Sequence, residues 1–291
     1  MKNKLNTQAD KLKNLQESHH SLDFQSKVDK ALESGSLASN WWWNSQNSNY
    51  LRHTFPFYAC KEFWKSLPQS KILNLMDGKG GCEGHFFNSL GHKSCSADIS
   101  IEALKAAKDI GFIDEYSKQD AEELSFENES FDYVVVKESL HHLPRPYMAI
   151  YEMLRVCKEG IYIVEPQDNS YSIGDEPYES CGNFKFAFSI KELIKSFIAL
   201  GYTNICYRNL FEIEFIINEN GGYVGGEEFK KTEPHIRNLI KQFHDRHSTN
   251  IGQFVCVFCF KNKPPQEHIN KLKSAGWTFP LIKGNPHLQK I

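Results

Sequence analysis

The feature that most constrains this chain is an apolar segment that runs directly into a glycine cluster. Residues 72–76 read ILNLM, and Gly78, Gly80 and Gly81 follow almost at once. Glycine has no Cβ atom, so such a loop adopts positive φ angles and lets a ligand lie against bare backbone. A helix that begins after the loop offers unpaired N–H groups to the same ligand. The order of strand, glycine loop and helix predicts a nucleotide-binding turn in an α/β fold.

An acidic residue follows at the spacing of a ribose contact. A second strand-like segment, residues 94–98, ends at Asp98, which lies 98 − 78 = 20 residues after Gly78. At that spacing a carboxylate meets the ribose hydroxyls of a bound nucleotide. A dinucleotide fingerprint would also need glycine at position 83, where the chain has Glu83. This departure leaves an NAD-dependent oxidoreductase as a minor alternative.

Three further motifs follow in order. Residues 120–124 read DAEEL, residues 130–134 read SFDYV, and residues 140–143 read LHHL. Together with the glycine loop they resemble the class I S-adenosylmethionine-dependent methyltransferases, over residues 70–166. The resemblance implies that S-adenosylmethionine is the cofactor. It also implies a doubly wound, mostly parallel Rossmann-like sheet, preceded here by an N-terminal helical extension.

The resemblance assigns residues to the methyl donor. It places Gly78 and Gly80 under the donor's amino acid end, Asp98 on the ribose and Asp120 on the adenine edge. The residues that would flank the adenine are Ile99 and Ala121.

The chain departs from the family near the end of its first strand. Asn74 stands where the family usually has Asp, and Met76 where it usually has Gly. The donor's ammonium group would lose a carboxylate partner, and Asp77 is the candidate replacement. Lys137, after the fourth strand, is a further candidate for donor binding. Because of these departures, a donor-binding protein without transfer activity stays open as an alternative.

Polar side chains gather where the fourth and fifth strands are expected to end. Glu138, His141 and His142 follow one strand, and Glu165 closes the next. Methyl transfer to a hydroxyl benefits from a base, and an imidazole titrates near neutral pH. His141 or His142 is the candidate base, with Glu138 or Glu165 as orienting partner or second candidate. Because adjacent residues of an extended loop point apart, we expect only one histidine to face the cleft.

These residues predict methyl transfer to a small polar acceptor. By analogy, the acceptor is most concretely a hydroxyl of a sugar or sugar nucleotide used in a surface polysaccharide, whereas an N-methyltransferase remains an alternative. Consecutive tryptophans at 41–43 fit a carbohydrate platform, and an interface or a satellite core explains them equally well. Tyr50, Arg52 and His53 follow them and are candidates to reach the donor's carboxylate or the acceptor.

Composition disfavours several classes of function. The 291 residues carry 34 basic and 36 acidic side chains, so no global positive field favours nucleic acid. The longest apolar run, residues 254–260, is too short to cross a bilayer, and the polar start lacks a secretory signal. The eight cysteines are scattered and do not form a disulfide framework. We expect a cytoplasmic globular protein without a membrane span or a nucleic-acid partner.

Two short pairs have the spacing of metal ligands. Cys256 and Cys259 lie in a segment that alternates like a strand, which sends positions i and i+3 to opposite faces. His244 and His247 lie on a helical stretch without an apparent third ligand. We predict no metal site.

Strand-like and helical patterns alternate from residue 71 onward, which favours a parallel sheet with helices on both faces. The expected units are a helical cap or extension at 1–55, a methyltransferase domain at 56–262 with a helical insertion at 218–250, and a tail at 263–291. Strands are expected at 71–76, 93–98, 115–119, 132–137, 160–165, 210–217 and 254–260. Helices are expected at 56–67, 82–91, 100–109, 146–156, 189–200 and 227–247, with a loop at 36–50.

Leucines at heptad-like intervals mark the N-terminal segment. Leu5, Leu12, Leu15 and Leu22 follow one another in a polar, lysine-rich stretch. Their spacing predicts one or two amphipathic helices. Such a stripe caps an active site, joins a partner subunit in a homodimer or, most commonly, packs on its own domain.

Overall fold

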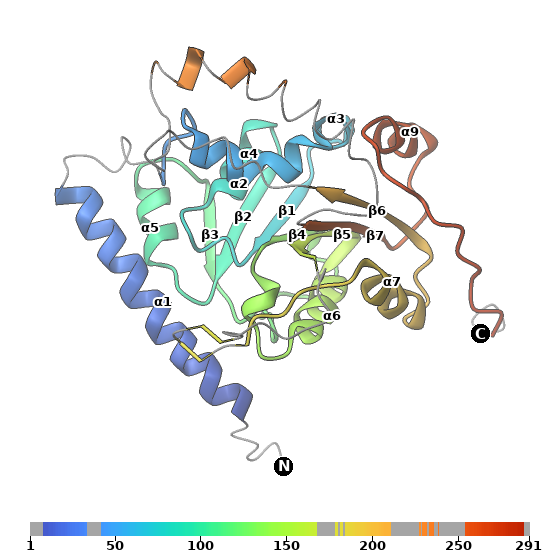
Figure 1. Ribbon diagram of the computed structural model, residues 1–291, viewed down its shortest axis with the longest axis horizontal. Helices are drawn as coiled ribbons and strands as arrows, with labels where there is room; N and C mark the ends of the chain where they lie inside the picture. The colour runs from blue at the N-terminus through green and yellow to red at the C-terminus, as the bar shows by residue number, and fades with distance from the viewer. Residues whose placement is uncertain are drawn as a thin grey trace.

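A twisted sheet forms the centre of the protein, with helices on both of its faces (Figure 1). This computed structural model describes residues 8–33, 42–167, 178–179, 181–182, 184–210, 227, 229–231, 233–235, 238 and 254–287. Within them the sheet has seven strands, Lys71–Leu75 (β1), Lys93–Asp98 (β2), Glu115–Lys118 (β3), Phe131–Lys137 (β4), Cys157–Pro166 (β5), Asn204–Leu210 (β6) and Phe254–Phe260 (β7). The helices that the argument uses are Gln8–Glu33 (α1), Ser48–Tyr58 (α2), Lys61–Ser66 (α3), Cys82–Ser89 (α4), Glu102–Asp109 (α5), Leu140–His142 (η2, a 3-10 turn), Pro146–Val156 (α6), Ile190–Ala199 (α7) and Gln266–Ser274 (α9).

The strand order is β3-β2-β1-β4-β5-β7-β6. The pairs from β3 to β5 are parallel, and β7 runs antiparallel to both β5 and β6. This confirms the doubly wound, mostly parallel Rossmann-like sheet. The chain winds outward in opposite directions from β1 and β4, so the crevice between their carboxyl ends is where such a sheet binds its ligand.

Successive side chains of the strands face two separate cores. Ile72 packs with α2, α3, α4 and α9 on one face, and Leu73 packs with α6 and α7 on the other. Cys256 and Cys259 fall on opposite faces, as their strand-like spacing predicted, and both are free thiols. No group of three His, Cys, Asp or Glu side chains among the described residues has the geometry to hold a metal ion.

The region before β1 differs from the sequence-based expectation. A helix was expected to begin at Pro56, but α2 begins at Ser48 and contains Pro56 near its end, so part of the expected loop is helical. The cause is Asn47, whose side chain accepts a hydrogen bond from the Tyr50 N–H (2.9 Å) and caps the helix earlier. Pro56 is tolerated late in this helix, and its carbonyl accepts a hydrogen bond from the Tyr162 hydroxyl (3.0 Å).

The structure has a strand that the sequence did not predict, β6, just before the one expected at 210–217. β6 runs from Asn204 to Leu210 because β7 holds it in register over that whole length, from Asn204 opposite Phe260 to Leu210 opposite Phe254. This edge strand contains polar residues, so it does not stand out as an apolar run in the sequence. Residues 211–217 lie outside the described residues, as do most of the helix expected at 227–247 and the insertion expected at 218–250.

The N-terminal helix α1 turns its leucines to the solvent. Leu15, Leu22 and Leu32 are 57%, 75% and 56% exposed, whereas Phe24 and Val28 are buried against α5. The stripe therefore packs on its own domain in part: Val28 and Ala31 are buried and Leu12 is half-buried, whereas these three leucines face the solvent. No helix within the described residues is both long enough and apolar enough to cross a membrane.

The segment after β7 joins the main core. Helix α9 packs beside α3, and the Trp277 ring lies 4.8 Å from that of Phe258 and 5.7 Å from that of Tyr162. Thr278 pairs with Tyr207 of β6 through backbone hydrogen bonds of 2.9 Å.

Replacing Trp277 with alanine should lower the free energy of unfolding by about 3–5 kcal/mol, because a buried ring is lost from a packed aromatic cluster. Leu281→Ala is the matched control in the same segment, since Leu281 is 98% exposed. Urea denaturation followed by circular dichroism measures both. Equal stabilities for the two variants would show that the C-terminal segment does not contribute to the core.

Candidate functional site

The loop after β1 closes on the carboxylate at the end of β2. The Gly78 N–H donates a hydrogen bond of 3.1 Å to Asp98 Oδ2, and the Ser100 N–H donates one of 2.9 Å to Oδ1. A Cβ atom on Gly78 would lie 2.4 Å from Asp98 Oδ2, so only glycine fits here. Burial raises the pKa of Asp98 to about 6, and the backbone donors offset this only in part.

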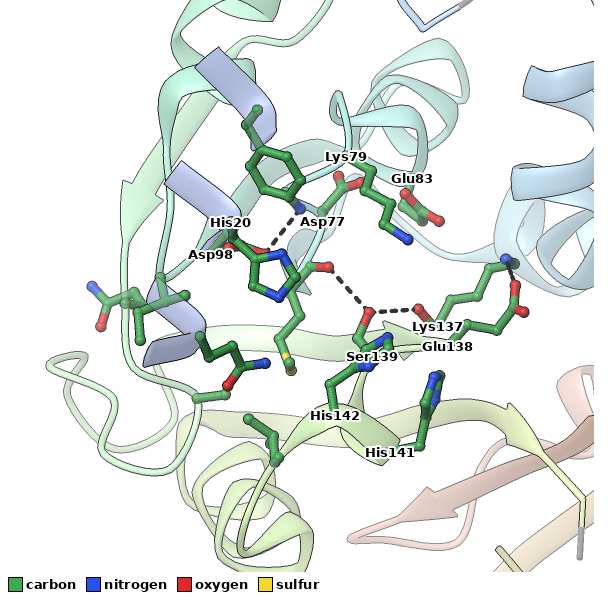
Figure 2. Close-up of a pocket in the computed structure, with 18 of the residues that line it drawn as sticks. His20, Asp77, Lys79, Glu83, Asp98, Lys137, Glu138, Ser139, His141 and His142 are labelled. Atoms are coloured by element: carbon green, nitrogen blue, oxygen red, sulfur yellow. Dashed lines mark hydrogen bonds and ion pairs between the residues drawn. The ribbon is translucent and has the colours of Figure 1, made fainter. Parts of the chain in front are cut away.

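A pocket of about 270 Å³ opens at the carboxyl ends of β1, β2 and β4 (Figure 2). Asp98 and Asp120, which come from separate strand ends, line this same pocket. The other sequence-predicted residues that line it are Arg52, His53, Asp77, Gly78, Ile99, Ala121, Lys137, Glu138, His141 and His142. Residues that the sequence separates by up to 90 positions (142 − 52) therefore share one cavity.

Gly80 differs from the expectation that it binds the donor. It is not among the residues that line the pocket, and a Cβ atom there would lie 3.3 Å from Trp42 O and 3.4 Å from Trp43 Nε1. The φ angle of Gly80, +118°, turns it toward this tryptophan segment. Trp43 is buried, and the Lys27 ammonium lies 4.9 Å from the Trp42 ring centre. The two tryptophans thus pack over the glycine loop, and Trp41 lies outside the described residues.

The acidic residues near the donor's expected amino acid end are arranged as a pair. Asp77 Oδ2 accepts hydrogen bonds from Ser96 Oγ (2.7 Å) and from the Gly84 N–H (3.0 Å). Burial and the adjacent Glu83 carboxylate raise the pKa of Asp77 well above its usual value. Burial alone would raise the pKa of Glu83, but the hydrogen bonds from Asp77 and His53 together with the charges of His53 and Lys137 lower it, so Asp77 holds the proton and Glu83 the charge. Sequence reasoning gave the charged role to Asp77 and missed Glu83.

Asn74, at the position of the family's aspartate, faces a neighbouring strand. Its Nδ2 donates hydrogen bonds to Ser94 Oγ and to the Cys95 carbonyl (3.3 Å), and its side chain is not among those that line the pocket. Met76, at the family's glycine position, adopts a φ of +62°. Glu138 at the end of β4 has a φ of +47°. Both strands therefore end in left-handed backbone that non-glycine residues adopt at a cost of about 1–2 kcal/mol, a sign of a constrained site.

Glu165 organises the turn after β4. It is fully buried, and its Oε1 accepts hydrogen bonds from the Ser139 N–H (2.8 Å) and the Leu140 N–H (2.7 Å). Its Oε2 lies 2.7 Å from His141 Nδ1. An ionised carboxylate only accepts hydrogen bonds, so Nδ1 carries the proton and Nε2 keeps its lone pair when the ring is neutral. This is the histidine–carboxylate arrangement of a positioned general base.

The two histidines do not point apart, which corrects the expectation. Their ring centres lie 3.9 Å from each other, and both rings line the pocket. The reason is that they belong to the 3-10 turn η2, in which successive side chains are about 120° apart and not 180° as in a strand. His142 Nδ1 lies 2.8 Å from Glu179 Oε2.

Lys137 and Glu138 form an ion pair at the edge of the pocket. Burial alone would raise the pKa of Glu138, but the Lys137 ammonium lowers it to about 2. A carboxylate this acidic is a weak proton acceptor, so the geometry favours His141 over Glu138 as the base.

Helices α1 and α2 supply the remaining walls of the pocket. On α1, Lys13, Gln16, His20 and Phe24 follow one helix face and form a roof that the sequence reasoning missed. The signal was present as polar and aromatic residues at i, i+3, i+7 and i+11. On α2, Arg52 and His53 line the pocket as expected. Tyr50 does not, since it is buried against Phe112 and His85.

Comparison with known proteins identifies the domain. Residues 78–164 match a family model described as "Methyltransferase domain". Over these residues the chain matches a methyltransferase domain, and its sheet has the Rossmann-like fold of the class I S-adenosylmethionine-dependent methyltransferases. Over 99 residues it is 31% identical to a probable phthiotriol/phenolphthiotriol dimycocerosates methyltransferase 2 of Mycobacterium ulcerans. That match covers 33% of this chain and 38% of the relative, well under two thirds of the relative's length.

Solved methyltransferases share the fold. One is an N1-methyltransferase of Burkholderia thailandensis, solved with 1,6-didemethyltoxoflavin and S-adenosylhomocysteine, with a TM-score of 0.52 and 12% identity over 90% of this chain and 93% of that one. Another is a Thermotoga maritima methyltransferase described as a possible histamine N-methyltransferase, with a TM-score of 0.51 and 16% identity over 84% of this chain and 100% of that one. At these identities the likeness concerns the fold alone.

The residues of this class I domain suit the family's donor. Because Gly78 has no Cβ atom, its backbone approaches the Asp98 carboxylate closely and lies bare beside the pocket. Asp98 and Asp120 open into one hollow at the carboxyl ends of the strands, where sheets of this kind bind their ligands. Gly78, Asp98 and Asp120 are therefore the residues that would hold S-adenosylmethionine.

Donor affinity should fall as the pH falls through the pKa of Asp98. This pKa is raised to about 6, so the folded protein favours the protonated carboxyl, and the associated stability is lost as the pH rises from about 4 to 6. Ribose hydroxyls donate to the ionised form, which at pH 5 is only about a tenth of the population. The Kd for S-adenosylhomocysteine should therefore be about tenfold weaker at pH 5 than at pH 7.5 by calorimetry.

Asp98→Asn is the control for this pH dependence. It should bind the ligand weakly at both pH values, with a ratio near one. A variant that kept the tenfold ratio would assign the pH dependence to another group.

Proposed function

We propose that this protein transfers a methyl group from S-adenosylmethionine to a hydroxyl of a small polar acceptor. The observation that carries the proposal is the His141–Glu165 pair, held at 2.7 Å beside the pocket that Asp98 and Asp120 also line. Bound S-adenosylmethionine supplies a methyl group on a positively charged sulfur. The residues of this chain have to align an acceptor oxygen with that methyl and remove its proton.

The base proposed for this step is Nε2 of His141. Glu165 fixes the tautomer and the orientation of the ring, because its Oε2 accepts the Nδ1 proton. His142 packs against the His141 ring and faces Glu179, which makes it a wall of the acceptor side. Glu138 is committed to Lys137.

The acceptor proposed is a polar molecule, with a hydroxyl of a sugar or sugar nucleotide as the leading candidate. The support is the lining, where charged and hydrogen-bonding side chains outnumber apolar ones. The tryptophan segment no longer supports a sugar, since Trp43 is buried and Trp42 packs over the glycine loop. The M. ulcerans relative is named for a lipid acceptor, so lipids belong in the acceptor panel. A cytoplasmic site of action without nucleic acid remains part of the proposal.

Replacing His141 with glutamine should lower turnover by about 10²–10⁴-fold, because the proton acceptor is lost. His142→Gln, a matched change on the adjacent residue, should lower it less than about tenfold. Release of S-adenosylhomocysteine is measured across sugars, sugar nucleotides, amines and lipids, and calorimetry checks that both variants still bind the donor.

The outcomes separate the alternatives. Full turnover after loss of both histidines, on an amine, would replace the hydroxyl acceptor with nitrogen, the atom that the B. thailandensis enzyme is named for methylating. Donor binding without turnover on any acceptor would indicate a non-catalytic protein. Failure to bind either S-adenosylmethionine or S-adenosylhomocysteine would remove the donor site itself.

We also propose a homodimer through α1, supported by its three exposed leucines. Sedimentation velocity at about 50 μM should show a dimer, a concentration at which micromolar interfaces are populated. Leu15→Glu with Leu22→Glu should convert it to a monomer, because both positions lie on the solvent side of the helix. Lys11→Glu, an exposed position on the same helix, is the control. A wild-type monomer at this concentration would contradict the proposal.

A further inference from the structure

The carboxylate expected to read the adenine edge already has a partner within the chain. Lys13 Nζ of α1 donates a hydrogen bond of 2.7 Å to Asp120 Oδ2 and lies 2.9 Å from Glu122 Oε2. Asp120 Oδ1 accepts the Glu122 N–H at 2.9 Å. Lys13 is buried although it lies on a surface helix, because its aliphatic chain runs inward from α1 to reach these two carboxylates.

Lys13 also divides the space around Asp120. On its inner side is the pocket of about 270 Å³, and on its outer side is a second hollow of about 320 Å³ between α1 and the end of β3. Both hollows are lined by Lys13, Ile99, Gln119 and Asp120. The inner pocket alone lies below the usual range of about 300–1,000 Å³ for ligand sites, and it would have to hold a donor and an acceptor together.

The two acids differ in how well they tolerate loss of the lysine. Glu122 is fully buried and is also bound by Arg145, whose N–H and Nε each donate to it at 2.8 and 2.7 Å. The Asp120 side chain is 32% exposed and has no other cation within ion-pair distance among the described residues. Lys13 can therefore leave Asp120 and keep Glu122 as its partner, and a ligand can take the place that it vacates.

We propose that Lys13 is a positioning residue that competes with the donor's adenine for Asp120 and so couples donor entry to the seating of α1. The inference rests on the proposed donor site. While Lys13 is hydrogen-bonded to Asp120, the inner pocket is closed at its adenine end and this contact holds α1 in place. When the adenine 6-amino group hydrogen-bonds to Asp120, Lys13 moves onto Glu122. The two hollows then join, and the α1 roof packs over the nucleoside.

Other contacts of α1 provide a control that leaves Asp120 untouched. Glu17 lies 2.6 Å from Lys118, and Ser21 Oγ lies 3.2 Å from Ser100 Oγ. Glu17→Gln loosens α1 at its ion pair with β3 without removing the Lys13 contact. Lys13→Gln removes the competing charge, and Lys13→Arg keeps it.

The test measures the Kd of S-adenosylhomocysteine and of S-inosylhomocysteine by calorimetry. The inosyl analogue carries a carbonyl oxygen where adenine has its 6-amino group, so position 6 presents an acceptor to Asp120 in place of a donor. Lys13→Gln should bind S-adenosylhomocysteine about threefold to tenfold more tightly and should not gain affinity for the inosyl analogue. Lys13→Arg should match the wild type, and Glu17→Gln should shift both ligands by the same factor.

Three results would overturn the proposal. If Lys13→Gln changed the Kd of both ligands by the same factor, Lys13 would be only a structural contact of α1. Weaker binding of S-adenosylhomocysteine by Lys13→Gln would make the lysine a supporting group and not a competitor. If the wild-type protein bound neither ligand, the proposed donor site itself would be wrong. That failure differs from one in which the wild type binds S-adenosylhomocysteine but the Lys13 variants do not distinguish it from the inosyl analogue.

Discussion

The contact between the Gly78 N–H and the Asp98 carboxylate is the constraint on which the site depends. It joins the ends of β1 and β2 at Gly78, where any side chain would collide with the Asp98 carboxylate. Because the contact occupies only part of the carboxylate, Asp98 can fix the loop and still face the pocket. Burial also raises the pKa of this carboxyl to about 6, so its charge, and with it nucleoside binding, should depend on pH near that value.

The two sides of the pocket are built differently. On the side proposed for the acceptor, Glu165 receives three hydrogen bonds from one short turn and sets the His141 ring, so the proposed base is part of the sheet's framework. On the donor side, the roof is a surface helix attached by side-chain contacts such as those of Lys13 and Glu17. The rigid half suits proton transfer, which needs alignment, and the attached half suits ligand entry, which needs movement.

Much of the fold could be predicted because the signals are local. The strands expected at 93–98 and 254–260 match β2 and β7 to the residue, the second of them as a strong apolar run, and Pro146 marked the start of α6. The errors arose where a tertiary contact decides the outcome: Asn47 caps α2 earlier than Pro56 suggests, and β7 places the polar edge strand β6. In the site, the strand-end residues were predictable because parallel strands share an edge. The partition of charge between Asp77 and Glu83 and the approach of Lys13 to Asp120 depend on distances that the order of residues does not contain.

The saturation of Glu165 has an evolutionary consequence. Loss of His141 would leave one oxygen of a buried carboxylate without its partner, and loss of Glu165 would strand two backbone donors and free the imidazole. A mutation that replaces the proposed base therefore also disturbs the turn that carries it. Divergence in this lineage should therefore accumulate in the helices that cover the cavity, so that the range of molecules admitted drifts while the chemistry stays fixed.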